Sequence, residues 1–202
     1  MKQRDFWSGL ECMSSGEGLM ADWQWAFGSG LDAVRRFLKP TDKQSVSFPC
    51  PERPACECRH EIQETDFGLM AVCVCGDGGC EAFRVEPKDV LVYGLDVEAL
   101  GAEVTRALGM SAANGSAYVS AGLREIGTYV AVAAPVYLSL ARREALLREV
   151  QKLLGQKEGP FLLLTPTGSS WSAEVEAMAR PHGGAHVSLS SVVDIGARGS
   201  NS

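Results

Sequence analysis

The chain has 202 residues, of which 46% are hydrophobic and 22% are charged, and it carries a formal net charge of −6 at pH 7. This length suffices for one ordinary core with a small extra module, and this composition excludes a fibrous protein. Because no stretch approaches the roughly 18 uninterrupted apolar residues of a membrane span, and no apolar region follows the first charged residues, we expect neither a membrane protein nor a secreted one.

The negative charge is concentrated in the middle of the chain. Residues 50–95 hold nine acidic and four basic residues, whereas the two signs nearly balance on either side. A protein that binds the phosphate backbone of nucleic acid needs the opposite sign, so we do not expect nucleic acid to bind this segment. Elsewhere, positive charge gathers only at Arg142, Arg143, Arg148 and Lys152.

Residues 19–38 carry apolar side chains at helical spacing, and Pro40 ends the pattern. Gly28 and Gly30 each cost a helix about 1 kcal/mol. We therefore predict one helix, or two short ones with a break at these glycines, whose aromatic residues pack in the core.

Residues 46–90 show the pattern of short strands separated by cysteine-containing turns. The expected strands are 46–48, 57–64, 69–74 and 82–85. The segment has few large apolar residues of its own, so something other than apolar burial must stabilise it.

The rest of the chain alternates between helical and strand patterns. Asp96 is a suitable N-cap for a helix that ends near Gly109, and residues 111–122 are expected to form a loop. Apolar runs then alternate with helical patterns, in the order 134–140, 142–154, 161–164, 171–179 and 186–189. Uninterrupted apolar strands between helices are typical of a parallel sheet buried on both faces, with right-handed connections.

The exposed edges of such a small sheet need a cover. Residues 123–132, a protein partner or a second copy of the chain could supply it, so a homo-oligomer is one expectation.

Six of the seven cysteines fall between positions 50 and 80, in two clusters. The first cluster holds Cys50, Cys56 and Cys58, and the second holds Cys73, Cys75 and Cys80. Clustered thiols in an odd total number argue against a disulfide framework and favour a reducing, cytoplasmic location. Two thiol-bearing turns separated by the length of a β-hairpin suit a tetrahedral zinc ion.

The segment 46–90 resembles a zinc ribbon, in which two cysteine knuckles at the tips of adjacent β-hairpins share one zinc ion. The resemblance rests on the Cys50-Pro51 opening and on the strand-flanked second cluster. This segment departs from the usual pattern because its knuckles are wider than Cys-x-x-Cys and because it has six cysteines instead of four. The resemblance implies a zinc ion shared by the two clusters.

The predicted metal ligands are Cys50, Cys56, Cys75 and Cys80. They are chosen because, in each cluster, they bracket loops of similar length. Cys58 and Cys73 each lie two residues from a chosen ligand, on the same face of an extended strand, so they are alternates or ligands of a second site. We expect His60 to be solvated and the isolated Cys12 to be a half-buried structural thiol.

Ligation by cysteine alone favours a closed, structural zinc site, because a catalytic zinc normally keeps one open position and uses His or carboxylate ligands. A redox role is the alternative. Closely spaced thiols can release metal and form disulfides on oxidation, which would make the module a switch.

A second candidate site lies where the strand at 161–164 leads towards the helix at 171–179. The carboxyl ends of parallel strands and the N-termini of helices attract anions. The candidate ligand-binding residues are Thr167, Gly168, Ser169 and Ser170. The segment lacks the lysine of a P-loop, and an N-cap at Ser170 or Ser172 is the simpler interpretation.

Enzymatic function has no motif in its favour. The sequence lacks Gly-x-Ser-x-Gly, His-Glu-x-x-His and Gly-x-Gly-x-x-Gly, and we expect His182 and His186 on the surface. We therefore expect a non-enzymatic zinc-binding protein that mediates protein interaction or regulation. The alternatives are a redox-sensing thiol switch and an enzyme with an anion-binding loop at 165–172.

The predicted fold class is α+β, with four parts along the chain. These are an N-terminal helical segment at 1–45, a zinc-ribbon-like β module at 46–95, a small α/β domain with a βαβαβ unit at 96–195, and a flexible tail at 196–202.

Overall fold

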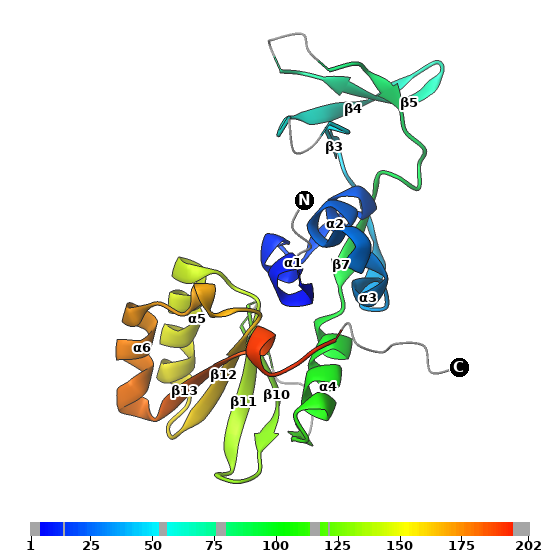
Figure 1. Ribbon diagram of the computed structural model, residues 1–202. Coiled ribbons are helices and arrows are strands. Elements are labelled where there is room, and N and C mark those ends of the chain that lie inside the picture. Colours follow the sequence, from blue (N-terminus) through cyan, green and yellow to red (C-terminus); the bar gives the residue numbers. More distant parts are fainter. Residues whose placement is uncertain are drawn as a thin grey trace, which may run out of the picture.

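The computed structural model describes residues 5–13, 15–52, 56–75, 80–113, 118–120 and 122–195. The chain contains both helices and strands, and the strands form three separate sheets. This confirms the predicted α+β class. Figure 1 shows the Cys-rich module projecting at one end of the molecule, the N-terminal helices in the middle and the α/β unit at the other end.

The N-terminal part combines three helices with a three-stranded antiparallel sheet. The helices are α1 (Phe6–Cys12), α2 (Met20–Phe27) and α3 (Leu31–Arg35), with a 3-10 turn, η1 (Gly28–Gly30), between the last two. The strands lie in the order β1 (Glu17–Leu19), β7 (Leu91–Leu95) and β2 (Leu38–Gln44). Gly28 has a φ of 54°, which glycine tolerates best, and the helix breaks there as predicted.

The sheet of β1, β7 and β2 has no counterpart in the sequence prediction, and its strands explain why. β2 contains Pro40, and most of its residues are exposed, so it shows no apolar alternation. β7 pairs with two strands that are remote from it in the sequence. Because β7 belongs to this sheet, hydrogen bonding favours ending the Cys-rich module near residue 90, and the division of the chain into domains remains a proposal.

The α/β unit is built on a sheet with the strand order β13-β12-β11-β10-β8. Its strands are β8 (Ser111–Ala112), β10 (Leu123–Tyr129), β11 (Ala134–Ser139), β12 (Phe161–Thr165) and β13 (Gly184–Ser188), and β9 (Tyr118–Ser120) also pairs with β10. β11, β12 and β13 run parallel, as predicted. β10 pairs antiparallel with β11, so one edge of the parallel sheet is covered by the same chain.

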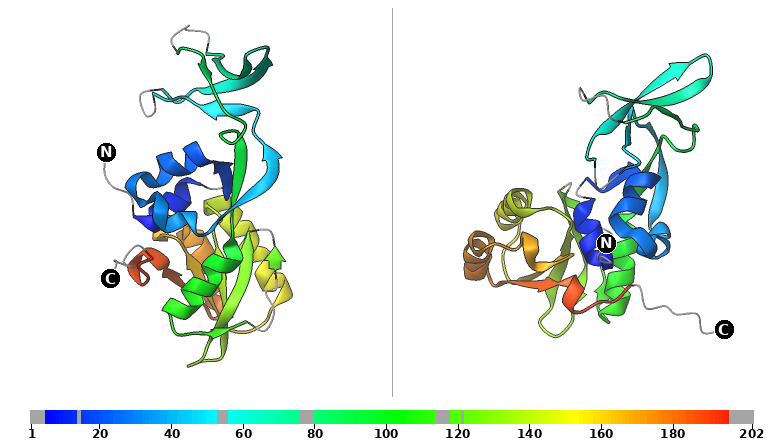
Figure 2. Two further views of the ribbon diagram at one scale, coloured as in Figure 1. Left: turned by 90° about the vertical axis from the view of Figure 1, so that its right-hand side faces the viewer. Right: turned by 45° about the horizontal axis from the view of Figure 1, so that its top comes forward.

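Helices cover both faces of this sheet (Figure 2). On one face, α5 (Arg143–Gln156) and α6 (Ala173–Ala179) pack on side chains such as Tyr137 and Leu163. On the other, α4 (Val97–Ala107) and the N-terminal helices form one apolar cluster with side chains such as Leu138. The N-terminal part and the α/β unit therefore share a core.

The capping residue predicted from the sequence at the start of α4 is confirmed. Asp96 caps α4 by accepting a hydrogen bond from the backbone N–H of Ala99 at 3.1 Å. Within the predicted loop at 111–122, two short pieces form the strands β8 and β9 instead. Residues 114–117 and 121 of that loop, and the predicted tail at 196–202, lie outside the described residues.

The Cys-rich module is a four-stranded antiparallel sheet that contains the four predicted strands. Their order is β3 (Ser47–Pro49), β4 (Arg59–Thr65), β5 (Gly68–Cys73) and β6 (Phe83–Arg84). Among the described residues, its buried apolar cluster consists of Ala71, Val85 and Val90, with a few half-buried side chains against them. Burial this limited leaves a sheet marginal in water.

Gly127 in β10 lies so close to β8 that a side chain does not fit. A Cβ atom there would lie 2.5 Å from the carbonyl oxygen of Ser111. We expect Gly127→Ala to lower the free energy of unfolding by about 1–3 kcal/mol, because the backbone must shift to relieve the overlap. Gly155→Ala in α5 is the matched control, since it meets open space and alanine favours a helix by up to about 1 kcal/mol. Urea unfolding should move in opposite directions for the two variants, and equal losses would contradict the packing at Gly127.

Candidate metal centre

Six cysteines meet at one end of the module's sheet, contributed by the end of β3, the segment before β4, the end of β5 and the segment after it. Antiparallel pairing places these strand ends at the same end of the sheet, with His60 opposite Cys73. The backbone N–H of Cys50 donates a hydrogen bond to the carbonyl oxygen of Cys58 at 3.1 Å, which continues the pairing into the cluster. The backbone therefore brings the thiols together.

The six thiols form two overlapping groups of four. The first group is Cys50, Cys56, Cys58 and Cys80, and the second is Cys58, Cys73, Cys75 and Cys80. Within each group, all sulfur atoms lie within 4.8 Å of one another. Either group could hold a metal ion, as a metal-binding module requires.

Several sulfur–sulfur distances match a tetrahedral thiolate site. Zinc–sulfur bonds of about 2.3 Å place neighbouring sulfurs of a tetrahedron about 3.8 Å apart. The Sγ of Cys80 lies 3.7 Å from those of Cys50 and Cys56. It lies 3.9 Å from the Sγ of Cys58, which is itself 4.0 Å from that of Cys73. These distances fit the donor set of a zinc site.

The two Cys-x-Cys pairs are more compact, with Sγ atoms 3.1 Å apart for Cys56 and Cys58 and 2.7 Å apart for Cys73 and Cys75. The pKa of Cys56 is lowered, chiefly by a hydrogen bond from the backbone of Cys58, and the pKa of Cys58 is raised, chiefly by the side-chain hydrogen bond between the two thiols. In the second pair, the side-chain hydrogen bond lowers the pKa of Cys73 and raises that of Cys75. One sulfur of each pair therefore loses its proton more readily, and the thiolate is the form that binds metal.

The predicted ligand set is divided between the two groups. Cys50 and Cys56 belong to the first, Cys75 belongs to the second and Cys80 belongs to both. The alternates are also within the groups, because strand pairing, and not loop length, decides which sulfurs meet. The choice of ligands remains a proposal.

His60 is fully buried, so the expectation of a solvated histidine is wrong. Its ring centroid lies 5.2 Å from that of Phe83, and its Nδ1 atom is 3.4 Å from the carbonyl oxygen of Ala71. Alternation along β4 turns this side chain inwards while Glu61 faces out. The imidazole is therefore part of the small core of the module, and it belongs to neither thiol group among the described residues.

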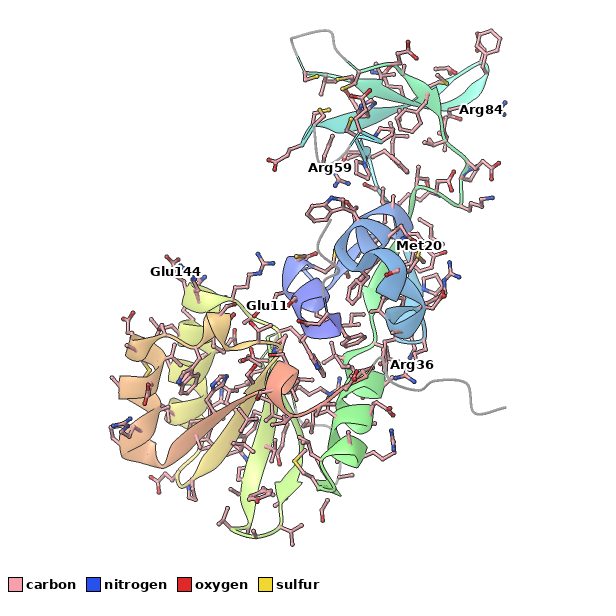
Figure 3. The ribbon with its side chains drawn as sticks, viewed as in Figure 1. Glu11, Met20, Arg36, Arg59, Arg84 and Glu144 are labelled. Atoms are coloured by element: carbon pink, nitrogen blue, oxygen red, sulfur yellow. The ribbon has the colours of Figure 1, made fainter. Side chains whose placement is uncertain are left out.

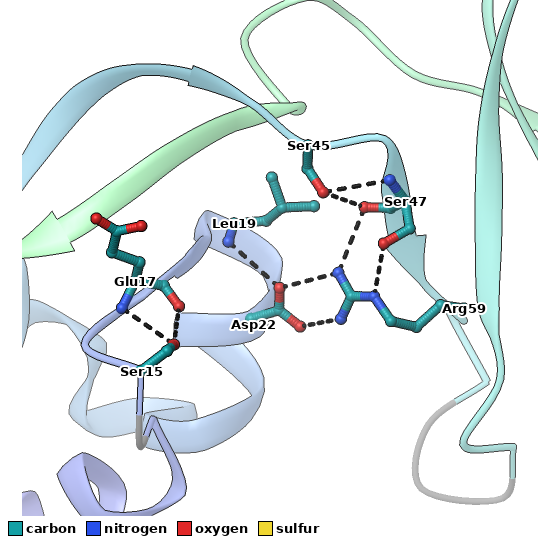
Figure 4. A network of polar contacts seen from close by, with 7 residues as sticks. All are labelled: Ser15, Glu17, Leu19, Asp22, Ser45, Ser47 and Arg59. Atoms are coloured by element: carbon teal, nitrogen blue, oxygen red, sulfur yellow. Dashed lines mark hydrogen bonds and ion pairs between the residues drawn. The ribbon is translucent and has the colours of Figure 1, made fainter. Parts of the chain in front are cut away.

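Arg59 links the module to the N-terminal helices, as Figures 3 and 4 show. Its guanidinium forms a two-pronged ion pair with Asp22 of α2, with Nη1–Oδ1 and Nη2–Oδ2 distances of 3.0 and 3.4 Å. Its Nε donates a hydrogen bond to the hydroxyl of Ser47 at 2.9 Å, which holds the arginine against β3. Since Arg59 directly follows Cys58, this contact with the body begins beside the thiol cluster.

A hollow of about 620 Å³ adjoins this ion pair, and its lining includes Glu57 of the module and Cys12 of α1. Cys12 is half-buried, as predicted, and belongs to neither thiol group. The junction between module and body therefore consists of a hollow and an ion pair, unlike the packed apolar core that the N-terminal part shares with the α/β unit.

The second candidate site is filled by a side chain of the same chain. The hydroxyls of Thr167 and Ser169 donate hydrogen bonds to Oε1 of Glu11 at 2.5 and 2.8 Å. Gly168, Ser169 and Ser170 form the short 3-10 turn η2 (Gly168–Ser170), and Thr167 is its N-cap. A carboxylate thus occupies the anion position that the sequence suggested, and binding of an external ligand there remains a prediction.

The simpler interpretation of this segment is confirmed at Ser172, whose hydroxyl caps α6 by accepting from the backbone N–H of Val175. His182 is exposed, as expected. The same expectation is wrong for His186, which is half-buried, stacks on Trp171 at 4.5 Å and lies 2.8 Å (Nε2–Oγ1) from Thr165. Burial lowers the pKa of His186.

Comparison with protein-family models, with curated proteins and with solved structures finds no match for this chain. The fold and the site define its class by themselves, as an α+β protein with a cysteine cluster that can bind a metal. Within the part of the chain that the structure describes, no helix combines the length and the apolar character needed to cross a membrane.

Glu11→Ala should weaken the contact between α1 and the loop after β12. The change removes the oxygen that accepts both hydroxyl hydrogen bonds, and we expect the free energy of unfolding to fall by about 1–2 kcal/mol. Glu11→Gln keeps an accepting oxygen and should retain part of this stability. Glu158→Ala, at an exposed loop position, is the control. Urea unfolding measures the free energy of unfolding of each variant. A decrease for Glu11→Ala no larger than that for Glu158→Ala would contradict the stabilising contact between α1 and the loop after β12.

Proposed function

We propose that this chain is a non-enzymatic zinc-binding protein whose Cys-rich module is folded by the metal and recognises a protein partner. The observation that carries the proposal is the convergence of six thiols at one end of a sheet with little apolar core. A cytoplasmic location follows from the same chemistry, since a reducing compartment keeps these thiols available to a metal.

Zinc is the metal that best suits the donor set. Sulfur ligands at tetrahedral spacing favour zinc, and sites made only of thiolates are closed and structural. In such modules the free energy of metal binding is the free energy of folding. The small cluster of Ala71, Val85 and Val90 fits this account, because it provides little stability of its own.

The module also exposes apolar side chains at several places, and we propose the one at the β4–β5 turn as its recognition site. Val46, Phe67 and Val74 are exposed large apolar side chains, and 82% of Phe67 is accessible to solvent. Phe67 lies in the turn between β4 and β5, on the module that projects from the body (Figure 1). Apolar side chains within an acidic segment suit a protein partner with an apolar and basic surface, and the excess of acids disfavours nucleic acid.

Purified full-length protein should contain zinc, and chelation should unfold the module selectively. We expect hydrogen exchange of residues 59–73 to rise after chelation, while residues 134–139 and 161–165 stay protected, because their apolar core does not depend on metal. Elemental analysis and hydrogen-exchange mass spectrometry provide the two measurements, and Cys12→Ser is the control that should keep its zinc. Reduced protein without zinc or another thiophilic metal would refute the proposal.

Phe67→Ser should abolish partner binding without changing metal content, because Phe67 lies in the β4–β5 turn, away from the thiols. Val132→Ser is the matched control, since Val132 is an exposed apolar residue of the α/β unit. Affinity purification under reducing conditions should recover the same protein with the wild type and with Val132→Ser, and should lose it with Phe67→Ser and after chelation. Equal recovery with Phe67→Ser would contradict recognition at this surface.

A further inference from the structure

Two sulfur atoms, those of Cys58 and Cys80, belong to both thiol groups. They lie 3.9 Å apart, close to the edge of about 3.8 Å in a tetrahedron of thiolates around zinc. One tetrahedron from each group would share this edge. We propose that the module holds two thiophilic divalent ions bridged by the thiolates of Cys58 and Cys80, an inference that rests on the zinc-binding function proposed above.

The number of thiols supports two ions. Two four-coordinate ions need eight bonds to sulfur, and six thiolates supply them only when two of the six bridge. The two groups together use six cysteines and share two. A single ion would leave two thiols without metal, either Cys73 and Cys75 or Cys50 and Cys56.

The remaining ligands separate into two pairs. Cys50 and Cys56 lie 3.7 Å (Sγ–Sγ) from Cys80 and belong to the first group alone. Cys73 and Cys75 belong to the second group alone. Their sulfurs are 2.7 Å apart and would open by about 1 Å to span a tetrahedral edge, which a Cys-x-Cys pair at the end of a strand can do by side-chain rotation.

Electrostatics does not oppose the second ion. One zinc ion with four thiolates and two protonated thiols carries about two negative charges, and so do two zinc ions with six thiolates, because the second dication replaces two protons. The segment 50–95 already has nine acidic and four basic residues. The second ion adds no net charge to this acidic surrounding.

Two ions would tie different segments of the module. The first group joins the end of β3 to the segment before β4, and the second joins that segment to the end of β5. The segment after β5 contributes Cys80 to both. Each ion would therefore restrict the movement of a different pair of segments. This explains why a small module would use six cysteines.

The zinc content of reduced, full-length protein and its variants tests the bridge. Wild type and Cys12→Ser should bind about two zinc ions per chain. Cys56→Ser and Cys75→Ser each remove a terminal ligand and should retain about one. Cys58→Ser and Cys80→Ser each remove a ligand from both ions and should retain less than about one.

Wild-type protein also gives a readout that needs no variant. Thiolate bridges couple two cobalt(II) ions magnetically, so the electron paramagnetic resonance signal per cobalt should fall as the second equivalent binds, and X-ray absorption of the zinc form should show a metal–metal distance. Wild-type protein that binds only about one equivalent, with the same content in Cys75→Ser, would overturn the bridged pair and leave the zinc-binding function intact. Two uncoupled ions would also overturn the bridge. Absence of metal from the reduced protein would overturn both proposals.

Discussion

Six sulfur atoms lie close together at one end of the module, where the ends of three strands meet, and the proposed function depends on that junction. The apolar cluster of Ala71, Val85 and Val90, even with the half-buried side chains packed against it, is small for a four-stranded sheet. Zinc binding in small thiolate modules supplies about 10–16 kcal/mol, which is enough to reverse that balance. The pairing of β4 with β5, which turns His60 inwards, brings the same strand ends together.

The contact between module and body is weaker and has a different role. The ion pair of Arg59 and Asp22 is partly exposed, and pairs of this kind contribute up to about 1 kcal/mol. It cannot replace the metal, but it can orient the module, because Arg59 also bonds Ser47 and directly follows Cys58. In the proposed function, the metal would determine whether the module folds, and the arginine would influence where the folded module points.

The sequence predicts those parts of the structure that local patterns encode. The helices and parallel strands of the α/β unit have clear apolar periodicity, and the two clusters of cysteines indicate a metal-binding module. The sheet of β1, β7 and β2 was not predictable, because β2 is polar, contains Pro40 and pairs with remote strands. The grouping of Cys58 and Cys73 with the other thiols depends on strand register. The hydrogen bond from Ser169 to Glu11 spans 158 positions, a distance that no spacing rule covers.

The body and the module are stabilised by different forces, and this limits what a change in metal can do. The N-terminal helices and the α/β unit share an apolar core, and none of the six clustered cysteines belongs to it. The apolar side chain of Phe67 lies at the opposite end of the β4–β5 hairpin from the sulfurs, and six residue pairs, from His60–Cys73 to Thr65–Gly68, connect the two ends. A hairpin alone is marginal in water, so release of the proposed metal would fray this ladder as far as the turn at Phe67. If the module works as proposed, metal occupancy would control the recognition surface through strand pairing, without any contact between the ion and the partner.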